Sequence, residues 1–136
     1  MLHLERNKIV IGMAMHCSAE DAWRLLTDTQ QWPHWGPSVT QVACERRFIE
    51  HNAAGRVKTR LGFWVPFTIS EYHDQRFWSW RIGRFPATGH RISVVDGASC
   101  MVAFDMPWWA FPYLIVCRVA LGRIRRLLMS GDRPFD

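Results

Sequence analysis

Large and small side chains alternate along residues 8–17, KIVIGMAMHC, and this alternation predicts a β-strand. Ile9, Ile11, Met13 and Met15 occupy every second position, and the positions between them carry Val, Gly, Ala and His. Because successive side chains of a strand point to opposite faces, the four large residues share one face. We therefore expect an early strand with one heavy and one light face.

The next segment, residues 17–28 (CSAEDAWRLLTD), has the pattern of a short helix. Ser18 is a candidate N-cap with Asp21 three residues later, a spacing similar to that of a capping box. Apolar residues follow at helical spacing until a proline and a glycine close the region. The connector WPHWGP then places Trp32 and Trp35 on a turn, where bulky aromatic side chains cap a core or line a pocket.

Strand-like segments then recur about every ten residues, separated by turn residues. The six segments are residues 39–50, 56–64, 67–73, 77–85, 88–95 and 98–106. Pro66 interrupts this series, and we expect it at a turn or on an edge strand. The Asp-Gly pair at residues 96–97 is a strong signal for a two-residue hairpin turn. The spacing predicts a meandering antiparallel sheet of about seven strands.

The last predicted element is a long amphipathic helix over residues 107–129, with apolar residues on one arc of the helical wheel. The other arc carries four arginines: Arg118, Arg123, Arg125 and Arg126. Pro112 lies inside this segment, so we expect it to kink the helix or to mark its true start. Trp108 and Phe111 fall on the arginine side, and we expect them to be buried at a cavity mouth or in a dimer contact.

Length and composition indicate one folded domain over residues 1–136, because 49% of the residues are apolar and 21% are charged. The aromatic content is high, with eight Trp and eight Phe. Such side chains bury about 150–250 Å² each, so they dominate either the core or the wall of a cavity. Both interpretations, a core filled with large side chains and a ligand-lined interior, remain open from composition alone.

The net charge of +5 allows anionic partners without requiring them. The basic residues are spread along the chain and no nucleic-acid-binding motif is present, so we expect no nucleic-acid partner. The arginine arc of the last helix is open to three interpretations. It is a solvated surface, a weak contact with an anionic membrane, or a homodimer contact, and the solvated surface is the simplest of these.

Cysteine usage points to a reducing compartment. The four cysteines are far apart and form no C-x-x-C pair, and the charged N-terminal segment does not resemble a signal peptide. Closely spaced metal ligands are also missing from the sequence, and the apolar stretch 106–121 is too short and too interrupted for a membrane span. We therefore expect a soluble, cytoplasmic protein with free thiols, no metal and no cofactor.

Three segments resemble the START-like or Bet v 1-like superfamily (SRPBCC), which includes polyketide cyclases and lipid-transport domains. They are SAEDAWRLLTDTQQWPHWGPSV (residues 18–39), GHRISVVDGASCMVAF (residues 89–104) and MPWWAFPYLIVCRVALGRIRRLL (residues 106–128). The resemblance implies an α+β helix-grip fold. In that fold a curved antiparallel sheet wraps around a long C-terminal helix, two short helices follow the first strand, and a mostly apolar cavity lies between sheet and helix.

Strand alternation, combined with that implied cavity, selects a set of inward-facing candidates for binding a hydrophobic ligand. The sheet and the first connector supply Trp35, Trp78, Trp80, His90, Val102 and Phe104, and the long helix covers them with Tyr113, Cys117 and Leu121. Such a cavity suits a planar or lipid-like molecule. Trp32 and Trp35 lie at the junction of helix and sheet, either one as a plug and the other at the cavity mouth, or both as plugs.

His90 and Tyr113 are the weak candidates for catalysis. An inward-facing imidazole is able to donate to a ligand carbonyl or to transfer protons near neutral pH, but a core histidine with satisfied hydrogen bonds is the simpler alternative. Tyr113 either orients a ligand or only packs. The sequence contains no G-x-S-x-G, H-E-x-x-H or phosphate-loop motif. A nucleophilic pair of Cys100 and His90 would require rapid alkylation of Cys100 near pH 7.

Three functions therefore remain. The first, which we prefer, is binding of a lipid, a polyketide or another aromatic metabolite in the internal cavity. The second is a cyclase or aromatase type of enzyme that uses acid and base groups in the same cavity. The third is a structural or interaction protein whose cavity is filled by its own aromatic side chains.

Overall fold

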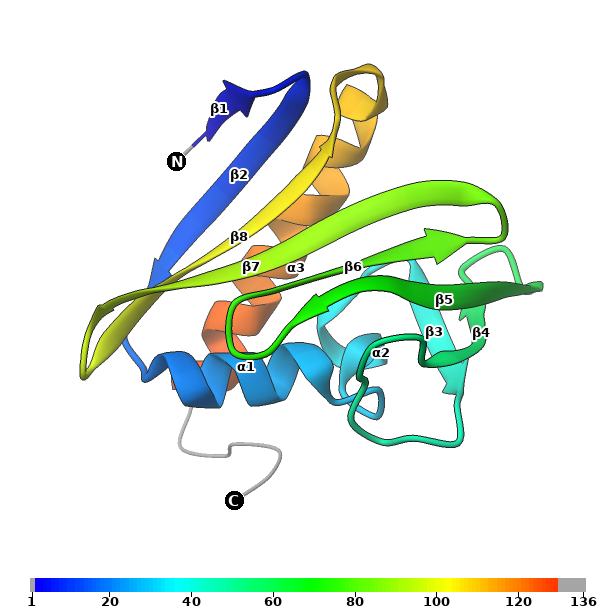
Figure 1. Ribbon diagram of the computed structural model, residues 1–136, viewed down its shortest axis with the longest axis horizontal. Coiled ribbons are helices and arrows are strands. Elements are labelled where there is room, and N and C mark those ends of the chain that lie inside the picture. Colours follow the sequence, from blue (N-terminus) through cyan, green and yellow to red (C-terminus); the bar gives the residue numbers. More distant parts are fainter. Residues whose placement is uncertain (1, 130–136) are drawn as a thin grey trace.

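A curved antiparallel sheet wraps around the C-terminal helix in the computed structural model, which describes residues 2–129 (Figure 1). The eight strands are β1 (Leu2–Glu5), β2 (Lys8–Met15), β3 (Val39–Ala43), β4 (Ala54–Thr59), β5 (Trp64–His73), β6 (Phe77–Ile82), β7 (Phe85–Asp96) and β8 (Ser99–Pro107). Their order in the sheet is β1-β2-β8-β7-β6-β5-β4-β3. Strands β3 to β8 thus form a meander, and β2 joins it beside β8, which confirms the predicted helix-grip architecture.

Two short helices, α1 (Ala19–Thr27) and α2 (Trp32–Trp35), lie between β2 and β3 and cover one end of the sheet (Figure 1). The Ser18 hydroxyl accepts a hydrogen bond from the backbone N–H of Asp21 at 3.2 Å, so the predicted N-cap is confirmed. Pro33 occupies the first turn of α2, where a missing N–H costs nothing. This turn of helix holds both of its tryptophans against the sheet.

The predicted C-terminal helix divides between Tyr113 and Leu114, just after Pro112. A 3₁₀ segment, η1 (Trp108–Tyr113), precedes the α-helix α3 (Leu114–Met129), so the proline does mark the true start of the helix. The expectation that Trp108 and Phe111 are buried at the cavity mouth was wrong, because both side chains are exposed. The helical wheel had put both residues on the arginine side, and burial was expected only because two exposed aromatic side chains so close together are uncommon; the 3₁₀ segment η1 instead presents both to solvent.

Several predicted strand boundaries differ from the structure. The strand predicted over residues 39–50 ends at Ala43, the one over 56–64 ends at Thr59, and the one over 77–85 turns at Gly83, whose φ is +61°. Pro66 lies inside β5 rather than at a turn. It pairs with β4 on one side, and the pairing of β5 with β6 on the other side begins only at the next residue, Phe67. Strand β1 was not predicted at all, because its four residues, LHLE, are too few for their alternation to stand out, and all four are exposed.

The core lies between the concave face of the sheet and the helices. Helix α3 contributes Leu121, Ile124 and Leu128, which are almost fully buried, and α1 contributes Leu25 and Leu26. This packing fixes α3 across the sheet and so sets the walls of the space between them. Within the described residues, no helix combines the length and the apolar character needed to cross a membrane.

Candidate functional site

The deepest part of the space between sheet and helices is filled by aromatic rings. Trp32 from α2 stacks on Trp78 from β6, with centroids 5.4 Å apart and planes 12° apart, and meets Trp80 and Phe67 edge-on at 5.3 Å. Its indole N–H donates to the backbone carbonyl of Leu26 at 2.9 Å. Trp32 is therefore a plug that joins the short helices to the sheet.

Trp35 lies on the other side of this cluster, close to the middle of the sheet. Its ring centroid is 6.0 Å from that of His90 and 5.9 Å from that of Phe104. It is almost completely buried, and its indole N–H has no hydrogen-bond partner among residues 2–129. Both tryptophans of the connector thus line the remaining inner space, and Trp32 in addition joins the short helices to the sheet.

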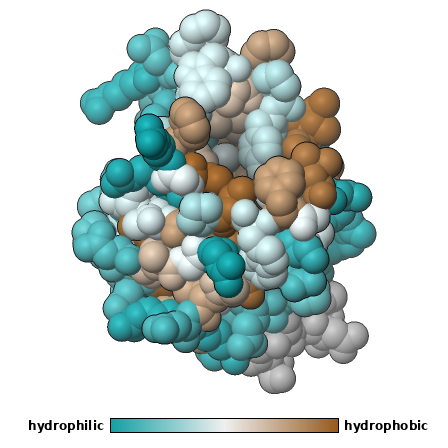
Figure 2. Space-filling view, turned by 90° about the vertical axis from the view of Figure 1, so that its right-hand side faces the viewer, coloured by the Kyte–Doolittle hydropathy of each residue, from teal (hydrophilic) through white to brown (hydrophobic). Residues whose placement is uncertain are grey.

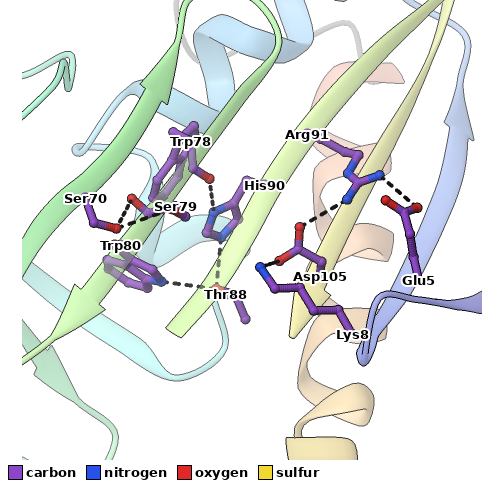
Figure 3. A network of polar contacts seen from close by, with 10 residues as sticks. All are labelled: Glu5, Lys8, Ser70, Trp78, Ser79, Trp80, Thr88, His90, Arg91 and Asp105. Carbon is purple, nitrogen blue, oxygen red and sulfur yellow. Dashed lines mark hydrogen bonds and ion pairs between the residues drawn. The ribbon is translucent and has the colours of Figure 1, made fainter. Parts of the chain in front are cut away.

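His90 on β7 is held by a chain of hydrogen bonds (Figure 3). Its Nδ1 lies 3.3 Å from the carbonyl oxygen of Trp78, and its Nε2 lies 3.2 Å from the hydroxyl of Thr88. Because a carbonyl only accepts, Nδ1 carries the proton and Nε2 accepts from Thr88. The Thr88 oxygen in turn accepts from the indole N–H of Trp80 at 3.1 Å, so all donors and acceptors of the chain agree.

The surroundings of His90 keep its ring neutral. Burial lowers the pKa of His90 to about 3, although the hydrogen bond to the Trp78 carbonyl acts in the opposite direction. Both ring nitrogens are engaged by protein groups, and the ring faces Trp78 and Phe104 rather than solvent. In this arrangement His90 has no free nitrogen with which to accept a proton from a ligand.

What remains of the inner space is a small cavity of about 30 Å³. A buried water needs roughly 10–15 Å³ of such space, so the inner cavity is too small for an organic ligand. Seven of the nine predicted site residues line it: Trp35, Trp78, Trp80, His90, Phe104, Tyr113 and Cys117. The other two, Val102 and Leu121, are buried in the core.

A second, larger cleft of about 480 Å³ opens outward from this cavity. Its walls are mostly apolar and include Val57 from β4, Val65 from β5, Ile82 from β6, Met106 from β8 and Trp109 from η1. Figure 2 looks onto this end of the molecule, where hydrophobic residues gather near the centre of the face and along one side. Next to the predicted site, the space able to hold an organic molecule is therefore this outer cleft, which lies nearer to solvent.

Five residues line both the inner cavity and the outer cleft: Ser38, Val39, Trp80, Thr88 and Tyr113. The phenol oxygen of Tyr113 lies 2.8 Å from the hydroxyl of Ser38. Burial raises the pKa of Tyr113, and the hydrogen bond to Ser38 opposes that shift only in part. The phenol is thus protonated at neutral pH and presents a hydroxyl pair at the inner end of the cleft.

Sequence reasoning missed Thr88, Ser38 and Trp109, although one signal for the first was present. Thr88 lies two residues before His90 on the same strand, so alternation places both side chains on the same face. Ser38 precedes β3 in a connector, and Trp109 lies in the 3₁₀ segment. Neither region has a periodicity from which the direction of a side chain is predicted.

The buried thiols do not form a nucleophilic site. Cys100 lies opposite Val94 in the sheet whereas His90 lies opposite Phe104, and both His90 nitrogens bond elsewhere. Burial, together with the neighbouring Cys17, raises the pKa of Cys100 to about 12. Burial also raises the pKa of Cys117 to about 12. Within the described part of the chain, no three His, Cys, Asp or Glu side chains are grouped as metal ligands.

A polar network on the opposite face of the sheet holds Asp105 (Figure 3). Its carboxylate lies 3.3 Å from the Arg91 guanidinium and 3.8 Å from the Lys8 ammonium, and Arg91 also reaches Glu5 at 3.5 Å. Asp105 is almost fully buried. The next residue along β8, Met106, lines the cleft. Because alternation directs the Asp105 side chain away from the cleft, this carboxylate serves the sheet and not the site.

The eight-stranded sheet curved around α3, with an apolar cleft at one end, defines a helix-grip protein with a ligand-sized space. A family model described as "Polyketide cyclase / dehydrase and lipid transport" matches residues 11–128. The chain belongs to this family, which confirms the resemblance seen in the sequence. A search of curated proteins finds no match.

Solved structures show the same fold at low sequence identity. A conserved protein of unknown function from Enterococcus faecalis, EF2215, aligns with a TM-score of 0.71 and 16% identity, covering 97% of this chain and 78% of that one. XoxI from Bacillus cereus aligns with 0.70 and 11%, covering 90% and 96%. The di-domain ARO/CYC protein BexL of the BE-7585A biosynthetic pathway aligns with 0.66 and 13%, covering 88% of this chain and 45% of BexL.

Proposed function

We propose that the protein binds a hydrophobic small molecule, such as a lipid, a polyketide or another aromatic metabolite, in the outer cleft. The observation that carries this proposal is the cleft itself, which offers about 480 Å³ between mostly apolar walls. Pockets for small organic ligands typically measure about 300–1,000 Å³ and combine apolar walls with a few polar groups. Membership of a family that includes lipid-transport proteins supports the same function.

The polar groups of the cleft lie at its inner end, where they would orient a ligand. Tyr113 and Ser38 form a hydroxyl pair, and the Thr88 side chain lies close to the boundary with the inner cavity. A ligand carbonyl or hydroxyl placed there would bond to one of these groups while its apolar body contacts Val57, Val65 and Ile82. Burial of the apolar part would supply most of the affinity, at roughly 25 cal/mol per Å² before the costs of association.

Binding is favoured over catalysis by the state of His90. Aldol closure and dehydration of a polyketone need a group that removes a proton and a group that supplies one. His90 is neutral, but both of its nitrogens are engaged in the aromatic cluster. The phenol of Tyr113 is placed to donate a proton to a ligand in the cleft. A cyclase or aromatase type of reaction is the second candidate function, and this hydroxyl is the observation that favours it.

The cysteines indicate the compartment of the protein, and the outer surface of α3 indicates possible partners. No disulfide joins any of the four cysteines among residues 2–129, which supports a reducing compartment such as the cytoplasm. Ile115 and Val119 on α3 are exposed, and a contact of this helix with a second copy or with an anionic membrane is a separate hypothesis. Variants of α3 serve as controls below and test it.

The proposed function is tested by filling the cleft. Ala110 lines the cleft from η1, so Ala110→Trp would occupy ligand space, and Ala87→Leu would do so from β7. Ala98→Trp is the matched control, because it adds the same ring in the exposed hairpin turn between β7 and β8. Binding is followed by titration with the fluorescent apolar probe anilinonaphthalene sulfonate and by native mass spectrometry of the purified protein.

We expect saturable probe binding, or a co-purifying mass, in the wild-type protein and in Ala98→Trp, and at least a tenfold loss of affinity in both filling variants. Such a loss, about 1.4 kcal/mol, is well within what blocking part of an apolar site causes. A wild-type protein that binds no probe and carries no ligand would contradict the proposal. Equal affinity of the filling variants would also contradict it, since the ligand would then lie elsewhere.

A further inference from the structure

Six large apolar side chains project into solvent around the mouth of the outer cleft, and we call them the apolar rim. They come from η1, from the turn between β4 and β5, and from the start of β7: Trp108, Trp109, Phe111, Leu61, Phe63 and Phe85. Each side chain is between 53% and 83% exposed. Leu61 and Trp109 line the cleft, and Phe85 directly precedes two residues that do. The rim therefore borders the opening and is not scattered over the surface.

The charges within the rim are all positive. The rim segments, residues 60–64, 83–86 and 107–113, contain two charged residues, Arg60 and Arg84, and both are exposed. The turn between β1 and β2 adds Arg6 beside η1, where the Trp108 backbone N–H donates to the carbonyl of Asn7 at 3.1 Å. Glu5, on the same turn, is engaged by Arg91 and His3. An anionic surface is thus the complementary partner.

The shape of the rim distinguishes a lipid surface from a protein surface. Stable protein interfaces place a closely packed apolar region at their centre and surround it with polar residues. The arrangement is reversed here, because the apolar residues sit on three separate tips and the centre is an open cleft. A fluid bilayer accommodates separate tips without a matching shape, and Trp residues favour its interfacial layer.

We infer that the apolar rim docks onto the surface of an anionic lipid bilayer. The aromatic side chains of η1 and the two turns insert among the headgroups, and the arginines beside them pair with lipid phosphates or carboxylates. The mouth of the cleft then faces the acyl region. Docking stands on the rim alone; only the further step, passage of a membrane-resident apolar ligand into the cleft without crossing water, rests on the proposed function.

Vesicle flotation of the purified full chain tests this inference. The vesicles consist of phosphatidylcholine with or without phosphatidylserine. Two rim variants avoid the cleft lining: Trp108→Ser/Phe111→Ser removes apolar contacts, and Arg84→Gln removes one positive charge. The matched control Ile115→Ser/Arg118→Glu changes an exposed apolar residue and an arginine on α3.

We expect the wild-type protein and the α3 control to float with phosphatidylserine-containing vesicles and to lose this binding at high salt. Loss of the Arg84 charge should weaken partitioning roughly fivefold, as expected for one basic residue at an anionic surface. The Trp108→Ser/Phe111→Ser variant should lose most of the binding. Blue-shifted tryptophan emission with vesicles, absent in that variant, would report insertion of the rim.

Three results would overturn the inference: a wild-type protein that stays in the aqueous phase, a loss in the α3 control equal to that in the rim variants, or a dimer in light scattering that dissociates when the rim is changed. Probe binding to the cleft is measured on the same variants without vesicles. A variant that no longer floats but still binds the probe separates a failure of docking from a failure of the proposed function.

Discussion

The imidazole of His90 lies flat on the indole of Trp78, with ring centroids 3.9 Å apart and planes 20° apart. The same two residues are joined by a hydrogen bond, because the ring Nδ1–H of His90 donates to the Trp78 carbonyl. A residue that resembles a catalytic histidine in the sequence is thus a structural member of an aromatic stack. This relationship places the ligand space farther out, between the stack and the exposed segment η1.

His90 should make stability depend on pH. Its pKa is about 3 in the folded protein, through burial, and about 6.5 in the unfolded chain, so only the unfolded state gains the proton between these values. The free energy of unfolding should therefore fall by about 1.4 kcal/mol per pH unit below pH 6.5, level off near pH 3, and show no such effect above pH 6.5.

The measurement is urea unfolding of the wild-type protein and His90→Phe between pH 5 and 8. The difference in slope between the two isolates the His90 contribution, since other titrating groups are shared. Nuclear magnetic resonance of the imidazole supplies a direct check. A His90 ring that titrates near pH 6 in the folded protein would contradict its placement in the stack.

The hydroxyl of Thr88 should contribute more to the free energy of unfolding than its methyl group. Thr88→Val leaves the His90 Nε2 and the Trp80 indole N–H without their partner, and a buried unpaired group costs about 1–3 kcal/mol. Thr88→Ser keeps the hydroxyl and loses one methyl, worth about 1 kcal/mol. Chemical denaturation of both variants compares them. Equal stability of Thr88→Val and the wild-type protein would show that the hydrogen-bond chain contributes nothing.

Alternation along the strands predicted much of the fold and part of the candidate site. Residues Ile9–Met15 alternate visibly because the large side chains lie on the face of β2 that α3 covers, whereas the small residues Gly12 and Ala14 lie on the other face. The same argument placed Trp78, Trp80 and His90 on the concave face. Strand β1, LHLE, is too short for this argument, and neither of its faces is buried.

Whether aromatic side chains fill the inner cavity could not be predicted from the sequence. Trp32 reaches Trp78 from a helix far away along the chain, and no local pattern states whether two such rings meet or leave a space between them.

The early end of β3 is also set by a contact between residues far apart in the sequence. Asp28, fully buried after α1, binds the Arg47 guanidinium through both carboxylate oxygens and so draws residues 44–50 away from the sheet. Such long-range partners override strand propensity.

The thiols should differ sharply in reactivity. Burial raises the pKa of Cys100 and Cys117 to about 12, so at pH 8 only roughly one thiol in ten thousand is the reactive thiolate. Cys17 is also buried. Cys44 is half-buried and belongs to the connection between β3 and β4. Iodoacetamide should therefore modify Cys44 alone in the folded protein.

Intact mass and peptide mapping after a short reaction at pH 8 would show the modified position. Cys44→Ser should abolish the modification, and unfolding in urea should restore reaction at the other three cysteines. Preferential alkylation of Cys100 in the folded protein would revive the nucleophile hypothesis and contradict the environment described above.

Gly89 should tolerate no side chain, because its position on β7 lies directly under Asp105. A Cβ atom at residue 89 would be 2.5 Å from the nearer Asp105 carboxylate oxygen and 2.8 Å from the Phe77 ring. We expect Gly89→Ala to cost about 1–3 kcal/mol of unfolding free energy through overpacking. Gly97→Ala is the matched control, since no atom lies within 4 Å of the added Cβ, and a change below about 0.5 kcal/mol is expected there.

A double-mutant cycle identifies the clash. If the carboxylate causes the cost, Gly89→Ala should destabilise the Asp105→Ala protein much less than it destabilises the wild-type protein, and the difference is the coupling between the two residues. Thermal unfolding of the four proteins measures it. An equal cost in both backgrounds would assign the effect to Phe77 or to the strand backbone. In the expected case Gly89 lets β7 pass beneath the ion-paired carboxylate of Asp105 while His90, the next residue, enters the stack on the opposite face.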